Sequence, residues 1–144
     1  MAGLYIHVPF CQKRCLYCDF YSNTDMGYQE AYLSALIREM ELRKNYLEGE
    51  TLETIYFGGG TPSQLSVENL DRIFEAIYRH FPVNQDMEIT LEANPDDMTP
   101  TYVAALRSLP VNRISMGVQS FDAADLKFLN RRHDREEALR AVRL

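Results

Sequence analysis

The chain has 144 residues, of which 21 are acidic, 15 are basic and three are cysteines. This length predicts one domain that can bury a core, and a net charge of −6 argues against a nucleic-acid binder held by basic surface charge. Because the sequence has no apolar run of the ~20 residues that a membrane span needs, and no secretory signal pattern, we expect a cytoplasmic protein.

Four β-prone runs alternate with segments of helical periodicity. The expected strands cover residues 4–8, 54–57, 87–91 and 113–118. The expected helices are residues 28–47, a segment capped by Ser66, a segment that begins at Thr99 and Pro100, residues 122–129 and a segment opened by Asp134 and Glu137. This alternation predicts an α/β fold in which parallel βα units share one sheet.

Four βα units do not close a barrel. A full (β/α)8 barrel takes ~250 residues, and residues 140–144 still have a helical pattern with no glycine or proline stop. We therefore expect residues 1–144 to be the N-terminal part of a larger barrel domain. A complete open sheet of four strands is the alternative, although it would leave strand edges exposed.

The three cysteines form a CxxxCxxC motif at Cys11, Cys15 and Cys18. An odd, clustered set fits disulfides poorly, and soft thiolates select zinc, Cu(I) or iron–sulfur clusters. A [4Fe–4S] cluster normally takes four cysteines, so three would leave one iron open. A structural zinc ion would need a fourth protein ligand. The sequence offers three histidines for that role, His7, His80 and His133.

Several polar or flexible residues follow the expected strands, where parallel barrels collect ligand-binding side chains. Residues 58–60 are glycines that expose backbone N–H groups to a ligand or simply form a tight turn. Glu92 and Gln119 end the third and fourth strands, and each is either a ligand contact or a solvated strand end. Tyr5 and His7 share one side of the first strand by its two-residue period.

Basic residues gather toward the end of the chain. Eight of the fifteen lie at or after Arg107. They form either a solvated helix face or, near Arg131 and Arg132, a site for anionic groups. Arg131 could supply a fixed fork for a carboxylate.

The cysteine motif, with Tyr17 before its last cysteine, resembles that of the radical SAM enzymes. Longer segments resemble the oxygen-independent coproporphyrinogen III oxidase family, and they keep their order over nearly the whole chain. These segments are residues 4–11, 56–63, 91–95, 114–121 and 129–133. The resemblance implies a partial TIM barrel in which residues 1–144 are the N-terminal part of the radical SAM core.

The resemblance also implies cofactors and contacts. Cys11, Cys15 and Cys18 would hold a [4Fe–4S] cluster whose open iron binds S-adenosylmethionine. The expected S-adenosylmethionine contacts are Tyr5, Tyr17, Gly59, Gly60, Thr61, Glu92, Gln119 and Arg131. No catalytic residue is predicted.

The residues after the motif separate two branches of the family. Cys18 is followed by Asp19 and Phe20 instead of a further cysteine two positions on, which resembles the HemW-type heme chaperones. The resemblance therefore implies a protein that binds and transfers heme, with heme-acceptor proteins as partners. An oxidase that decarboxylates a porphyrinogen is the alternative, and a small zinc-stabilised interaction module is the alternative from another class.

Overall fold

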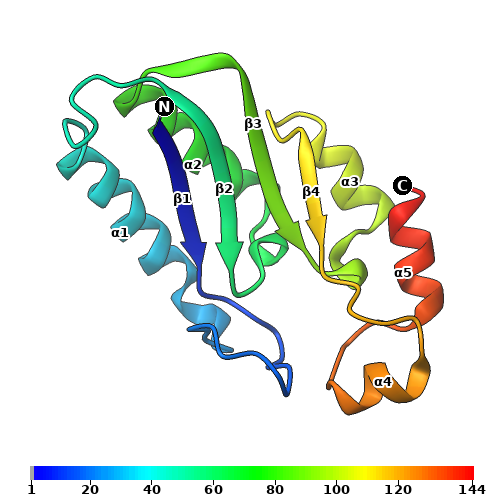
Figure 1. Cartoon of the computed structure of the whole chain (residues 1–144). Helices are drawn as coiled ribbons and strands as arrows, with labels where there is room; N and C mark the ends of the chain where they lie inside the picture. Colours follow the sequence, from blue (N-terminus) through cyan, green and yellow to red (C-terminus); the bar gives the residue numbers. More distant parts are fainter. Residues whose placement is uncertain (1) are drawn as a thin grey trace.

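Four parallel strands form the centre of the computed structural model, which describes residues 2–144 (Figure 1). The strands are β1 (Ala2–Val8), β2 (Leu52–Gly59), β3 (Val83–Ala93) and β4 (Arg113–Met116). They lie side by side in chain order, and all three pairings are parallel. Their carboxyl ends therefore meet at one edge of the sheet, where Figure 1 places the arrowheads.

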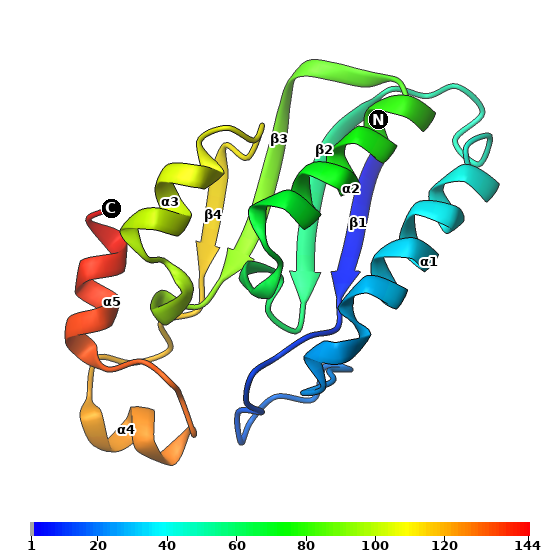
Figure 2. The ribbon, with the colours of Figure 1, turned by 180° about the vertical axis from the view of Figure 1, so that it is seen from behind.

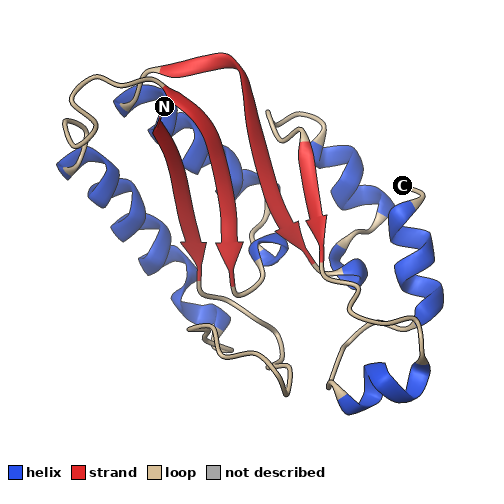
Figure 3. Cartoon of the chain, in the orientation of Figure 1, coloured by secondary structure: helices blue, strands red, loops and turns tan. Residues whose placement is uncertain are grey.

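The first three α-helices connect consecutive strands, and the last two follow β4. The α-helices are α1 (Gln29–Leu42), α2 (Val67–His80), α3 (Pro100–Leu106), α4 (Ala123–Phe128) and α5 (Arg135–Val142). Figures 1 and 2, seen from opposite sides, show α1, α2 and α3 on one face of the sheet. Short 3-10 turns follow β2 and β3, η2 (Pro62–Gln64) and η3 (Pro95–Asp97), and a third, η1 (Met26–Tyr28), precedes α1. In Figure 3 the helices and strands alternate along the chain as the sequence predicts.

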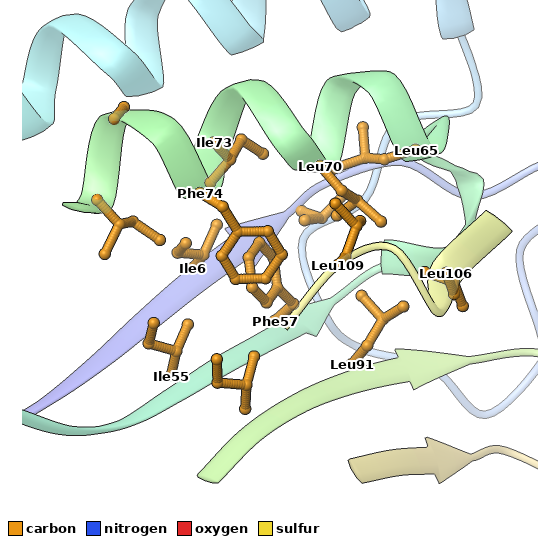
Figure 4. Packing of buried hydrophobic residues seen from close by; sticks show 14 of the residues in the cluster. Ile6, Ile55, Phe57, Leu65, Leu70, Ile73, Phe74, Leu91, Leu106 and Leu109 are labelled. Atoms are coloured by element: carbon orange, nitrogen blue, oxygen red, sulfur yellow. The ribbon is translucent and has the colours of Figure 1, made fainter. Parts of the chain in front are cut away.

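The core lies between the sheet and these helices. Ile55 and Phe57 of β2 are buried, whereas Tyr56 between them points to the opposite face. Phe57 packs edge-on against Phe74 of α2, with ring centroids 5.3 Å apart. Figure 4 shows these side chains together with Ile73 and other aliphatic residues from β1, β3 and α2. Burial of this face fixes which side of each strand is left for polar residues.

The expected strands and helix starts are confirmed. β1 begins earlier than expected, and β2 and β3 are longer than expected at both ends. The reason is that strand pairing extends beyond the apolar runs. Ser66, Thr99 and Asp134 each cap a helix with a side-chain oxygen. Asp134 and Glu137 form the reciprocal capping box, since each side chain accepts from the other residue's backbone N–H.

Two boundaries differ from the expectation. The helix expected over residues 28–47 ends at Leu42, and the next residues form turns in which Glu48 and Gly49 have φ of 50° and 85°. Leu47 packs against the core from a turn instead of a helix. The fourth strand ends at Met116 instead of residue 118, because the chain turns toward Gln119, which has φ of 69°. Periodicity alone does not register such turns, since apolar residues can reach the core from either conformation.

Candidate functional site

A cavity of about 320 Å³ lies at the carboxyl ends of the strands. The carboxyl ends of the strands and the segments after them contribute to its lining. They are the cysteine loop (residues 9–25) after β1, residues 59–62 at the end of β2, residues 92–94 at the end of β3, and residues 115–117 with Gln119 at the end of β4. Arg131, which follows α4, completes the wall. This is the edge where open parallel sheets bind ligands, because the loops there can vary without disturbing the core.

The cysteine loop is held at its base and near its tip. Cys11 donates its backbone N–H to Asn23 O at 3.0 Å, and Asn23 donates to Pro9 O at 2.6 Å. Farther along, Leu16 donates to the carbonyl of Leu129, the residue that caps the end of α4, at 3.1 Å. The loop is therefore tied to a segment more than a hundred residues away, and its thiols face the cavity as a consequence.

The three thiols are free and line the same cavity, with Cys11 buried and the other two half-buried. Hydrogen-bonding groups approach two of the sulfurs: Thr61 Oγ1 lies 3.4 Å from Cys11 Sγ, and Arg131 donates to Cys15 Sγ at 3.1 Å. The thiolate is the form of cysteine that binds metals. The donor set of the cavity therefore fits a thiolate-bound group.

The spacing of the thiols bears on which group fits. Within residues 2–144, no three His, Cys, Asp or Glu side chains gather as closely as a single metal ion requires. Tetrahedral Zn–S bonds of 2.3 Å would hold sulfurs about 3.8 Å apart, whereas each cysteine of an iron–sulfur cluster binds its own iron. A cluster therefore needs the three thiols to reach three separate irons, whereas a zinc ion needs them to reach one atom.

Two of the histidines considered as a fourth zinc ligand lie beside backbone carbonyls, and neither lines the cavity. His7 Nε2 lies 3.0 Å from Tyr21 O, so Nε2 carries the proton and Nδ1 accepts from Tyr5 Oη at 3.1 Å. His133 Nε2 lies 3.0 Å from Val118 O, and the ring is buried. Burial, with the nearby positive charge of Arg131, lowers the pKa of His133.

The glycines of β2 bring its end close to the end of β1. Gly59 has φ of 107°, and a Cβ there would lie 2.6 Å from ring atoms of His7. A Cβ on Gly60 would lie 2.8 Å from the carbonyl oxygen of Phe10 and 2.9 Å from that of Val8. Only glycine fits this approach, so the glycine backbone reaches the cavity beside the cysteine loop.

Glu92 is held in place by donors from the neighbouring strand. Its carboxylate accepts from Tyr56 Oη at 2.7 Å and from the Gly59 N–H at 3.2 Å. The hydrogen bond to this carboxylate is the main cause that raises the pKa of Tyr56, so the phenol stays a donor. Glu92 lines the cavity as a fixed acceptor for a hydroxyl or amino group.

Arg131 joins three parts of the wall. One terminal nitrogen donates to Asn94 Oδ1 at 2.6 Å and to Gly117 O at 2.5 Å. The other donates to Cys15 Sγ at 3.1 Å and to Tyr17 Oη at 3.3 Å. The guanidinium group is thus oriented by the ends of β3 and β4 together with the cysteine loop.

Arg132 has a different environment from its neighbour. It pairs with Asp96 and Asp97, each at 2.5 Å, and all three side chains are largely buried. The alternative of an anion site near both arginines is therefore wrong for Arg132, whose charge is compensated, and of the two only Arg131 lines the cavity.

The cavity brings together the expected site residues with one exception. Its lining includes Cys11, Cys15, Tyr17, Cys18, Gly59, Gly60, Thr61, Glu92, Gln119 and Arg131. Tyr5 lies apart on the open face of the sheet, where its ring stacks on Tyr56 with centroids 6.1 Å apart. It lines a second cavity, of about 470 Å³, between β1 and α1. The sequence places Asn94 in the segment 91–95 that carries the family resemblance but assigns it no role, and its contact with Arg131 has no local signal.

The fold and this cavity define a class of protein that the comparisons identify. The chain belongs to the radical SAM superfamily, whose family model matches residues 5–144. Within the superfamily, it is similar to members of the HemN/HemW family.

The relatives and solved structures are similar over nearly all of this chain. The heme chaperone HemW of Escherichia coli strain K12 is 39% identical over 99% of the chain and 38% of its own length. Radical S-adenosyl methionine domain-containing protein 1, mitochondrial, of Mus musculus is 37% identical over 98% of the chain and 32% of its own length. The structure of coproporphyrinogen III oxidase (HemN) from Escherichia coli superposes with a TM-score of 0.88 at 32% identity, covering 98% of this chain and 34% of that one.

The chain spans less than two-fifths of the length of these relatives. The α/β fold with a parallel sheet, expected as part of a radical SAM barrel, is confirmed by the superposition on HemN. No helix in residues 2–144 is long and apolar enough to cross a membrane.

Proposed function

We propose that Cys11, Cys15 and Cys18 hold a [4Fe–4S] cluster and that S-adenosylmethionine binds beside it in the same cavity. The observation that carries this proposal is the convergence of three thiols and the ends of all four strands on one cavity. The radical SAM family implies both groups in general. When bound, they supply the one-electron reductive cleavage of a sulfonium.

The residues of the cavity take separate roles in this proposal. Gly59, Gly60 and Thr61 offer backbone and hydroxyl groups to the amino-acid part of the ligand. Glu92 accepts hydrogen bonds from its amino or hydroxyl groups, and Arg131 attracts its carboxylate. Tyr17 and Gln119 line the cavity as well. Tyr5 contacts the ligand only if the ligand extends over the open face of the sheet.

We further propose that the whole protein is a heme chaperone that acts in the cytoplasm and transfers heme to acceptor proteins. Similarity to proteins named heme chaperone HemW supports this role. So does Asp19, which together with Phe20 follows Cys18 in place of a further cysteine. The second candidate is a coproporphyrinogen III oxidase, which the superposition on HemN at 32% identity favours.

Anaerobic reconstitution with iron and sulfide tests the cluster. We expect a brown protein with about four irons and four sulfides per chain. Replacing Cys15 by serine should remove most of the iron, whereas Asp19→Ala, an exposed change beside the motif, should retain it. Bound zinc without iron, or iron retained by the Cys15 variant, would contradict the proposal.

Heme titration and a porphyrinogen turnover assay test the role of the whole protein. A chaperone binds heme in a saturable manner and leaves coproporphyrinogen III unchanged. Decarboxylation of the porphyrinogen without heme binding would instead assign the protein to the oxidases. The cluster proposal is unaffected by either outcome, because both kinds of relative belong to the radical SAM superfamily.

A further inference from the structure

We infer that Asn94 is a positioning residue for Arg131, and that it orients the guanidinium group without compensating its charge. The inference rests on the proposed S-adenosylmethionine site and adds to it a residue to which the sequence assigned no role. Asn94 follows the last residue of β3 and lines the cavity. Its side chain contacts Arg131 on one side and Thr61 on the other.

The two adjacent arginines show why the acceptor matters. Arg132 is compensated by the carboxylates of Asp96 and Asp97, and it is not part of the cavity lining. For Arg131, the part of the chain that the structure describes provides no ion pair with a carboxylate. Its oxygen acceptors are neutral, namely the amide of Asn94, the carbonyl of Gly117 and the phenol of Tyr17. The sulfur of Cys15 is the remaining acceptor, so within residues 2–144 no carboxylate competes with an anionic ligand for the charge of Arg131.

The amide of Asn94 has a defined orientation. Because a guanidinium group only donates, the atom of Asn94 that faces Arg131 at 2.6 Å must be Oδ1. The amide nitrogen then faces Thr61 Oγ1 at 3.4 Å. Donation from Asn94 leaves the hydroxyl proton of Thr61 free to point at Cys11 Sγ, also at 3.4 Å.

An amide is the side chain that satisfies both neighbours. Through Arg131 and Thr61, Asn94 links contacts to the sulfurs of Cys15 and Cys11. An aspartate would hold Arg131 equally well, but it would neutralise the charge and attract the hydroxyl proton of Thr61 away from Cys11. An alanine would leave the guanidinium group with fewer acceptors and freer to rotate.

Three variants of the reconstituted chain test this role: Asn94→Ala, Asn94→Asp and, as a matched control, Asn45→Ala, which changes an exposed asparagine away from the cavity. The measurements are iron content, the S-adenosylmethionine dissociation constant by calorimetry, the midpoint potential of the cluster and the melting temperature of the metal-free chain. We expect full iron content in all variants and about tenfold weaker binding for Asn94→Ala, as for loss of one charge-assisted contact.

The aspartate variant is the sharper test. We expect Asn94→Asp to bind S-adenosylmethionine at least tenfold more weakly and to have a more negative midpoint potential, because a charge is added and a hydrogen bond to a thiolate is lost. Its metal-free chain should melt close to the parent. The control should match the parent in every measurement.

The outcomes separate this inference from the proposed function. Parent-like affinity in both Asn94 variants would overturn the role of Asn94 alone. So would parent-like affinity in Asn94→Asp with weak binding in Asn94→Ala, because a charged acceptor would then serve equally well. If Asn94→Ala fails to fold, the affinity and potential of Asn94→Asp decide. A parent chain that takes up iron but binds no S-adenosylmethionine would overturn the proposed ligand site itself.

Discussion

Adjacent residues in this chain have opposite electrostatic roles. Arg131 turns to the cavity and is held by neutral oxygen acceptors, whereas Arg132 is buried against two carboxylates. Asp97, one of those carboxylates, also accepts from Ser63 Oγ at 2.6 Å and from Gln64 Nε2 at 2.5 Å. The ion pair of Arg132 therefore joins the turn after β2, the turn after β3 and the segment that precedes α5.

Removing Arg132 tests whether this buried pair supports the fold. We expect Arg132→Met to lower the free energy of unfolding by about 3 kcal/mol, because it leaves two buried carboxylates without their charge partner. Arg43→Met is the matched control, since Arg43 pairs with Glu39 at 2.8 Å on the exposed surface and such pairs contribute about 0.5 kcal/mol. Urea denaturation measures both, and equal losses would contradict the assignment.

At the scale of single elements, helix starts are set by local chemistry. Ser66 accepts a hydrogen bond from the backbone N–H of Asn69 at 3.1 Å, and α2 begins at the next residue, Val67. The apolar face of α2 then buries Leu70, Ile73 and Phe74 against the sheet. Because α2 follows the glycine-rich end of β2, its start also fixes where that end of the strand leaves the cavity.

A cap variant tests this link. Ser66→Ala should destabilise the chain by about 1 kcal/mol, because one N–H of the first turn loses its acceptor. Ser34→Ala, an exposed change within α1, should be neutral or slightly stabilising, since alanine has the higher helix propensity. Thermal unfolding followed by circular dichroism compares the two. A loss in Ser34→Ala as large as that in Ser66→Ala would argue against the cap.

The end of α1 shows the limit of local patterns. Apolar residues continue at helical spacing as far as Leu47, yet the helix ends at Leu42. Turns place Leu47 against the core, and Gly49 takes a left-handed conformation before β2. Spacing predicts which side chains reach the core but not which backbone conformation brings them there.

For the whole molecule, the two faces of the sheet differ in composition. Phe57 and Leu91 are fully buried on the helix side, whereas Tyr5, Tyr56 and Arg113 share a row on the other side. The helix side supplies the hydrophobic stabilisation. The open side and the carboxyl edge of the strands are thereby left for polar groups and ligands.

Two phenylalanine variants compare the stability contributed by the buried core with that contributed by the exposed surface. Phe74 is fully buried against Phe57, so Phe74→Ala should cost about 4 kcal/mol of unfolding free energy through lost transfer energy and the resulting cavity. Phe128 is 73% exposed on α4, and Phe128→Ala should cost less than about 0.5 kcal/mol. Urea denaturation gives both values, and comparable losses would show that the core lies elsewhere.

The sequence by itself determined the features that depend on neighbours along the chain. Strand–helix order, the caps at Ser66 and Asp134 and the cysteine motif all follow from residues a few positions apart. Parallel pairing followed from the same order, because a helix between two strands returns the chain to the same end of the sheet. That is why the position of the cavity could be predicted before the structure.

Tertiary structure alone decided how the side chains of the cavity meet. The contact of Arg131 with Cys15 joins residues 116 positions apart, and that with Asn94 joins residues 37 apart. Two other features have the same origin. Arg132 is paired with carboxylates whereas Arg131 faces the cavity, and Tyr5 lies outside the cavity. Each depends on which loops the sheet brings together in space, and the positions of these residues along the chain do not show that.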